Sequence, residues 1–227
     1  MHVCLDGSSL RRVTILAAAL SAGCHHDPPA TAAAPKAMPA APLALSALAT
    51  QHIVLIPSFG LWLAPDVPAT WRTGLGRVDA ELRSLDSAIV SSLSARGVNR
   101  TWIFPAALDN DHRRNPTYVP DPYLLPEIPL LVPKLEVGNT APVDLASQLR
   151  TFISFHDGSR FVLAPVGPRF ELGAGGSVRA TLRLIVLDGR TGEVTWVGDV
   201  SGDAGAAFSP TILTALAERV GGLIVSR

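Results

Sequence analysis

The residues of this chain whose types could do chemistry gather in two short stretches. Asp109, Asp111 and His112 form the densest group of ionisable side chains. An imidazole beside two carboxylates can act as acid and base or bind a cation. The second stretch, Arg11–Cys24, ends on one of the chain's two cysteines. The carboxylate group is the candidate for catalysis.

Two interpretations of the Asp109–His112 segment are open. In one, it is the ligand-binding or catalytic loop of a periplasmic hydrolase or small-ligand-binding protein. In the other, adjacent ionisable residues in a polar loop are simply solvated. The sequence has neither the Gly-x-Ser-x-Gly elbow of hydrolases nor the His-Glu-x-x-His motif of metalloproteases. We therefore expect no enzyme activity, no catalytic residue, no metal site and no cofactor, with the Asp109–His112 loop as the alternative.

The stretch that ends at Cys24 has the parts of an export signal. Arg11 and Arg12 precede the apolar run Val13–Ala22, and Gly23 separates that run from Cys24. A cationic segment, a short apolar core and small residues at a cut site are typical of secretory signals. A helix of ten residues is only about 15 Å long, which is too short to cross a bilayer core of about 30 Å.

With Cys24 directly after small residues, the stretch resembles the lipobox of bacterial lipoproteins. The resemblance implies that residues 1–23 are removed as a signal peptide and that Cys24 becomes the first residue and carries acyl chains. The alternative is an ordinary cleavable signal that ends at small residues such as Ala17–Ala19.

Acylation of Cys24 predicts a membrane partner. Each buried CH₂ group contributes about 0.8 kcal/mol, so two or three chains anchor a protein stably where one does not. His25 follows Cys24, where many inner-membrane lipoproteins have Asp. By this resemblance, we expect a cell-envelope location, anchored in the outer membrane and facing the periplasm.

Residues 24–50 continue from the lipidated cysteine as an Ala- and Pro-rich tether. Such a composition cannot bury a core and forms a semi-rigid spacer. The segment His25–Asp27 has metal-binding residue types, but a metal site needs ligands that converge from an ordered scaffold. We interpret that segment as a polar spacer.

Composition predicts one folded domain over residues 51–227. Apolar residues make up 48% of the chain, which is enough for a core, and the formal net charge is zero. Nucleic-acid binding needs a concentrated cationic surface, so we expect no nucleic-acid partner.

The hydrophobic pattern of this domain predicts an α/β fold (an α+β layer). We expect a mixed β-sheet of about five strands with about three helices packed on it, and a Pro-rich loop insertion. In the hairpin, Leu182 and Leu184 should face the core, while Arg183 should meet Glu193 or Thr195 across the solvent side. The expected elements are strands at Ile53–Pro57, Arg100–Pro105 and Phe161–Val166, a hairpin at Arg179–Ser201, and helices at Arg77–Arg96, Pro142–Phe155 and from Ser209 onwards.

The insertion, residues 109–140, has two possible roles. Recurrent prolines should keep it extended, and a loop of this length is usually functional or disordered. It would either dock a partner protein of the envelope or cover the domain's own core with its apolar residues. The candidates for partner contact are Tyr118, Tyr123, Leu124 and Leu125.

The strand Ile53–Pro57 and the hairpin segment Leu182–Gly202 resemble the periplasmic α/β domains of the TolB amino-terminal and CsgG-like lipoproteins. Those relatives are accessory and assembly factors and not enzymes. The resemblance implies a lipid-anchored cell-envelope protein that acts as a binding or assembly accessory module, through an envelope protein partner.

Overall fold

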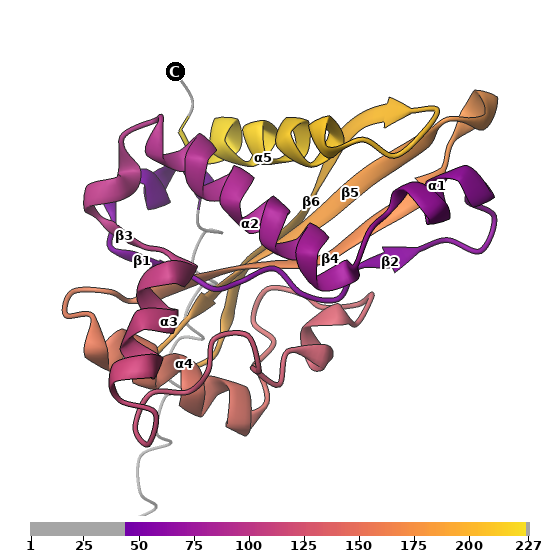
Figure 1. Ribbon diagram of the computed structural model, residues 1–227. Coiled ribbons are helices and arrows are strands. Elements are labelled where there is room, and N and C mark those ends of the chain that lie inside the picture. Colours follow the sequence, from indigo (N-terminus) through magenta and orange to yellow (C-terminus); the bar gives the residue numbers. More distant parts are fainter. Residues whose placement is uncertain (1–43, 226–227) are drawn as a thin grey trace, which may run out of the picture. The chain divides into compact units, whose positions relative to one another are not determined.

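A computed structural model describes residues 44–225 and confirms the α/β class. The predicted signal peptide 1–23, the predicted lipid-attachment residue Cys24 and most of the predicted tether lie outside the described residues. The elements, drawn in Figure 1, are η1 (Leu45–Thr50), β1 (Ile53–Leu55), β2 (Trp62–Leu63), α1 (Ala69–Gly74), α2 (Val78–Ser94), η2 (Val98–Arg100), β3 (Trp102–Ile103), α3 (Pro105–Arg114), η3 (Ile128–Leu131), α4 (Val143–Phe155), β4 (Phe161–Leu172), η4 (Ala174–Gly176), β5 (Val178–Asp188), β6 (Val194–Gly205) and α5 (Pro210–Ile224).

The six strands form one mixed sheet in the order β3-β1-β4-β5-β6, with β2 paired to β4. Strands β3, β1 and β4 run parallel, and β4, β5 and β6 form an antiparallel meander. Strand β2 is also parallel to β4 and continues along the same side of it, beyond β1. The parallel half therefore needs crossover connections, whereas hairpins suffice for the antiparallel half.

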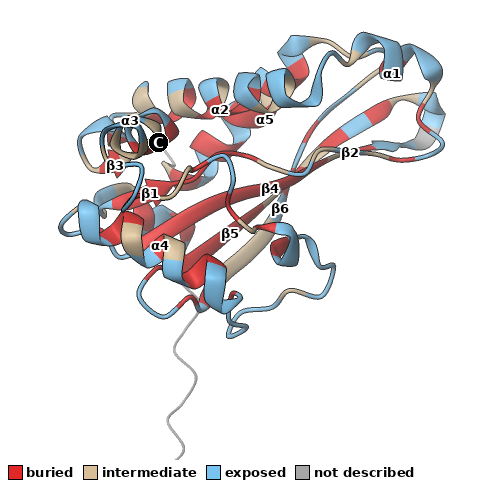
Figure 2. Cartoon of the chain, turned by 60° about the horizontal axis from the view of Figure 1, so that its bottom comes forward, coloured by how far each residue is buried: buried red, intermediate tan, exposed pale blue. Residues whose placement is uncertain are grey.

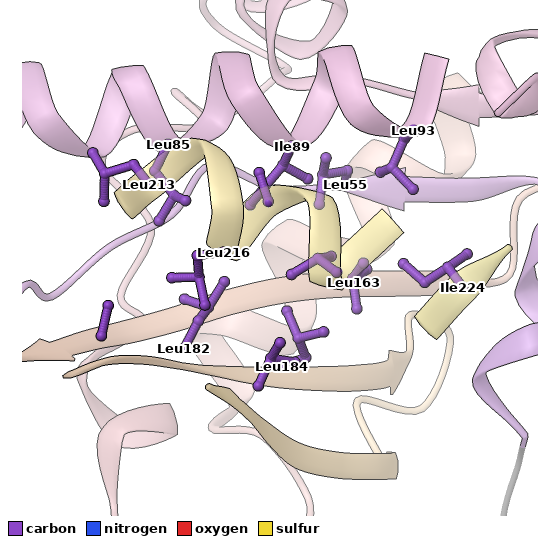
Figure 3. Close-up of a cluster of buried hydrophobic side chains, with 14 of the residues drawn as sticks. Leu55, Leu85, Ile89, Leu93, Leu163, Leu182, Leu184, Leu213, Leu216 and Ile224 are labelled. Carbon is purple, nitrogen blue, oxygen red and sulfur yellow. The ribbon is translucent and has the colours of Figure 1, made fainter. Parts of the chain in front are cut away.

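Helices cover both faces of the sheet because both faces are apolar. On one face, α2 and α5 lie side by side over Leu55, Leu163, Leu182 and Leu184, as Figure 3 shows. On the other face, α3, α4 and the segment that joins them cover the opposite side chains of the same strands. Figure 2 shows that β4 and β5 are buried along most of their length. The alternation of the hairpin is thus predicted correctly for the face that carries Leu182 and Leu184. The opposite face is not wholly exposed to solvent, because Ile185 on that face is buried.

Helix α2 lies within the predicted range, but Val78, the first residue of its predicted apolar stripe, is 44% exposed. Leu85, Ile89 and Leu93 of α2 are buried as the helical spacing indicates. Gly97 follows in the left-handed conformation with φ of 88°. The charged side chains of an amphipathic helix are expected on its solvated face, but Asp86 is only 7% exposed. That expectation is wrong because residues of other elements close over this side of the helix.

Three boundaries also differ from the predictions. The Asp109–His112 segment is not a loop: α3 begins directly after β3 with Pro105 in its first turn, where a proline needs no amide hydrogen. The irregular segment is therefore residues 115–142, which we call the strap. The folded part also begins before residue 51, because Leu45 and Leu48 of η1 are buried in the core.

The hairpin register corrects one cross-strand pair. The pairing of β5 with β6 places Arg183 opposite Asp199 and not opposite Glu193 or Thr195. Arg183 Nε donates to Asp199 Oδ1 at 3.0 Å. Within residues 44–225, none of the helices combines the length and the apolar character needed to cross a membrane.

The α2–α5 contact gives the first testable prediction. A Cβ added at the buried Gly221 would collide with the hydroxyl of Ser92 and the guanidinium of Arg96, which is itself tied to Glu218 at 2.7 Å. A Cβ at the exposed neighbour Gly222 would meet nothing.

We expect Gly221→Ala to lower the free energy of unfolding by about 1–3 kcal/mol through overpacking. Gly222→Ala should raise it by up to about 1 kcal/mol, since alanine favours the helix. Urea denaturation of both variants measures the difference, and equal effects would contradict this packing.

Candidate functional site

The structure gives the three predicted chemistry-bearing residues of α3 separate partners. Asp109 pairs with Arg113 one helical turn away. Asp111 lies 3.0 Å from Nε2 of His156, which follows α4. His112 Nδ1 lies 2.8 Å from the carbonyl oxygen of Val119. The contacts of Asp111 and His112 tie α3 to neighbouring segments, the Asp109–Arg113 pair lies within the helix, and the three side chains do not come together in one cavity.

The predicted partner-contact residues of the strap divide between surface and core. Tyr118 and Leu124 are 76% and 77% exposed, whereas Leu125 is 9% exposed and packs in the core with Val119 and Leu130. The half-exposed Tyr123 lies under the guanidinium of Arg83, 5.6 Å from the ring centre. The two roles considered for this segment therefore belong to different residues within it. Leu125 covers the core and is not available as a surface contact.

A groove of about 560 Å³ runs between the strap and the sheet. Its residues come from β2 and the turn before it, from β4 and β5, and from the strap. The lining of this strap groove is Gly60, Leu61, Trp62, Leu131, Pro133, Val166, Gly167, Arg169, Glu171 and Arg183.

Two glycines shape the floor of the strap groove. Gly60 and Gly167 have φ of +72° and +55°, and a Cβ on either would lie 3.0 Å from the Leu131 side chain. They therefore allow Leu131 to approach the sheet closely. Arg183 also fastens the strap, because its Nη1 donates to the carbonyl oxygen of Val132 at 3.1 Å.

A second cavity, of about 320 Å³, lies where the chain changes faces of the sheet. Strand β1 leads into α2 on one face, and the neighbouring parallel strand β3 leads into α3 and α4 on the other. In open α/β sheets, such a switch point at the carboxyl ends of strands is where ligands bind. The lining of this switch-point cavity is Arg83, Asp86, Ser87, Val90, Ser91, Phe104, Pro105, Ala106 and Tyr123.

Two buried carboxyl groups belong to this region. Asp86 and Glu127 are 7% and 6% exposed. Oδ1 of Asp86 accepts the amide hydrogen of Ser58, just beyond the carboxyl end of β1, at 2.7 Å. Oδ2 of Asp86 and Oε1 of Glu127 are buried and have no hydrogen-bond partner in the described part of the chain. Buried polar atoms of this kind are costly and uncommon, so each needs an explanation.

Burial dominates the proton affinity of both groups. It raises the pKa of Asp86 to about 6, against the opposing effect of the hydroxyl and amide of Ser58. Burial and the neighbouring charge of Asp86 raise the pKa of Glu127 to about 9. The pKa of the Tyr123 hydroxyl is also raised, by burial and by the charges of Asp86 and Asp109, against the effect of Arg83. At neutral pH, Glu127 is thus protonated and Asp86 is mostly ionised.

Sequence reasoning missed this carboxyl pair. Asp86 does carry a signal, because it lies four residues after Leu82 and three before Ile89, which is the spacing of the buried stripe itself. Ser58 and Glu127 carry none, since only the tertiary fold brings them near α2. Within residues 44–225, no group of three or more His, Cys, Asp or Glu side chains could hold a metal ion.

No protein-family model and no curated protein sequence matches the chain. Among solved structures, it is similar to the PelC dodecamer from Paraburkholderia phytofirmans, with 15% identity, a TM-score of 0.38, and coverage of 83% of this chain and 96% of that one. It is also similar to lipoprotein GNA1162 from Neisseria meningitidis, with 19% identity, a TM-score of 0.31, and coverage of 66% and 77%. A third is the hypothetical protein CT253 from Chlamydia trachomatis, with 14% identity, a TM-score of 0.35, and coverage of 78% and 99%. Likenesses of this size carry no argument about function.

The raised pKa of Glu127 predicts how stability depends on pH. Between about pH 4.5 and 9 the folded state binds more protons than the unfolded state, so the free energy of unfolding falls as pH rises. The slope from one group is at most about 1.4 kcal/mol per pH unit. Glu127→Gln does not titrate, so its midpoint temperature should fall less than that of the wild type between pH 5 and pH 8.

Glu136→Gln is the matched control, because it removes a carboxyl group at an exposed position of the strap. Calorimetry at several pH values compares the three proteins. If the Glu127→Gln variant loses stability with pH as steeply as the other two, Glu127 is not buried as a protonated acid.

Proposed function

We propose that this protein is a lipid-anchored cell-envelope protein that acts as a binding or assembly accessory and not as an enzyme. The anchor rests on the arrangement of Arg11–Cys24, which predicts export and acylation of Cys24. By the same resemblance, the domain faces the periplasm from the outer membrane. A net charge of zero leaves nucleic acid outside the proposed partners.

The strap groove is the observation that carries the binding function. Trp62 lines it from β2 and is 47% exposed, and Leu131 lines it from η3 and is 38% exposed. Ile128 is not part of the groove lining, but it precedes Leu131 by one turn of the same short helix and is 78% exposed, so it extends the apolar surface beside the groove. Exposed apolar side chains gathered at a groove are typical of a protein interaction site, whereas single ones are ordinary. The groove therefore supports docking of a partner protein.

The catalytic alternative has less support. Asp111 and His112 hold α3 against neighbouring segments, Asp109 pairs within the helix, and the three side chains do not converge on a substrate site. The small-ligand alternative, predicted at Asp109–His112, is supported by a different feature, the switch-point cavity.

The anchor is tested by Cys24→Ala. Without a thiol to acylate, the protein should move from the membrane fraction to the soluble periplasmic fraction of the native host, and the N-terminal peptide of the wild type should carry the mass of its acyl chains. Unchanged fractionation, or a wild-type peptide with the mass of its amino acids alone, contradicts lipid anchoring.

The binding function is tested by Trp62→Ala combined with Ile128→Ser. Both side chains are exposed, so the free energy of unfolding should change by no more than about 0.5–1 kcal/mol. Leu131 is left in place, because its contact with the groove glycines holds the strap. Recovery of a crosslinked envelope protein from native membranes should fall strongly, because exposed apolar surface at the strap groove is lost.

Leu223→Ser is the matched control, since Leu223 on α5 is 47% exposed and lies outside the groove lining. It should leave recovery unchanged. By contrast, Leu125→Ala should cost about 2–5 kcal/mol of stability, because Leu125 covers the core. Equal recovery from the groove variant and the control overturns the proposal.

A further inference from the structure

The switch-point cavity has features that partner docking at the strap groove does not use. We propose that it binds a small organic cation, a protonated primary amine on an apolar body, with the carboxylate of Asp86 as its counter-ion. This inference is independent of the proposed envelope function.

Asp86 has one carboxylate oxygen that accepts no hydrogen bond from the described residues. Asp86 lines the cavity and is 7% exposed, and its Oδ1 accepts the amide hydrogen of Ser58 at 2.7 Å. Oδ2 accepts none, and the hydroxyl of Ser58, which lowers the pKa of Asp86, is also buried without a partner among the described residues. The backbone bond fixes the carboxylate in place and leaves one oxygen for a donor. A ligand N–H group would supply the missing hydrogen bond, and a charged donor makes such bonds stronger.

The charges around the cavity are mostly negative. Carboxylates reach this region from several elements: Asp86 from α2, Asp121 from the strap and Asp109 from α3. Glu127 is protonated at neutral pH and adds no charge there. Asp109 is already paired with Arg113. Among the lining residues, Arg83 is the opposing charge, and its guanidinium lies over the Tyr123 ring. The remaining acidic groups favour a cation over an anion.

The wall of the cavity is mostly apolar. Val90, Phe104, Pro105 and Ala106 present apolar surface, and the hydroxyls of Ser87 and Ser91 add polar positions. The volume of about 320 Å³ is that of a small-molecule site. Mostly apolar walls with one oriented carboxylate suit an amine with a compact apolar body.

The same groups predict a pH dependence. Burial raises the pKa of Asp86 to about 6, so its protonation at lower pH removes the counter-ion and weakens binding. A bound cation stabilises the ionised forms of Asp86 and Glu127, so binding above pH 6 should release protons.

The test uses the full chain and two matched probes, 2-phenylethylammonium and the uncharged 2-phenylethanol. Ligand-observed NMR titration at pH 7.5 should give saturable binding of the amine and at least about tenfold weaker binding of the alcohol, a difference of about 1.4 kcal/mol. Calorimetric titration of the amine in two buffers of different ionisation enthalpy should show proton release.

Two variants should change amine affinity in opposite directions. Asp86→Asn keeps an oxygen for the Ser58 amide and removes the charge, so affinity should fall at least about tenfold. Arg83→Gln removes the opposing cation at an exposed position, so affinity should rise. Circular dichroism verifies that both variants fold.

Three results would each overturn the proposal. One is absence of saturable amine binding to the wild type. Another is equal affinity for the amine and the alcohol. The third is an Arg83→Gln variant, folded as the wild type is, that binds the amine more weakly or no better.

Discussion

Burial of both faces of one mixed sheet is the constraint on which this structure depends. The central strands β4 and β5 are apolar on both sides, so each side needs its own cover. Helices α2 and α5 cover one face, and α3, α4 and the strap cover the other. The chain therefore changes faces between α2 and α3, across strand β3. The segments that follow the neighbouring strands β1 and β3 therefore leave the sheet on opposite faces. The switch-point cavity lies between these segments, at the carboxyl ends of the two strands.

The carboxyl pair stands out against this apolar packing. A fold that needed only a core would place an apolar residue at position 86, because it shares the spacing of the buried stripe of α2. Asp86 instead retains a buried oxygen without a partner among the described residues, and Glu127 is held as a neutral acid. Local rules of this kind are most often broken at functional sites, and the structure offsets the cost elsewhere.

The strap combines two roles that are usually divided between elements. Val119, Leu125 and Leu130 complete the core beneath α3 and α4, so the strap cannot leave without exposing it. Its other apolar side chains, such as Leu124 and Ile128, are exposed to solvent. Arg183 and the two groove glycines hold this segment close to the sheet. A binding surface on such a segment is ordered before a partner arrives, which lowers the entropy cost of binding.

The elements whose pattern is local could be predicted from the order of residues alone: the helix α2, the helices α4 and α5, the β5–β6 hairpin and the α/β class. The sequence also predicts the anchor at Cys24, which lies outside the described residues. The partner of Arg183 and the burial of Asp86 and Glu127 depend on tertiary contacts, and the structure corrects Asp109–His112 from a loop to a helix. The reason is physical. Helical and strand periodicity depend on neighbours along the chain, whereas burial, strand register and pKa depend on groups that distant segments bring together.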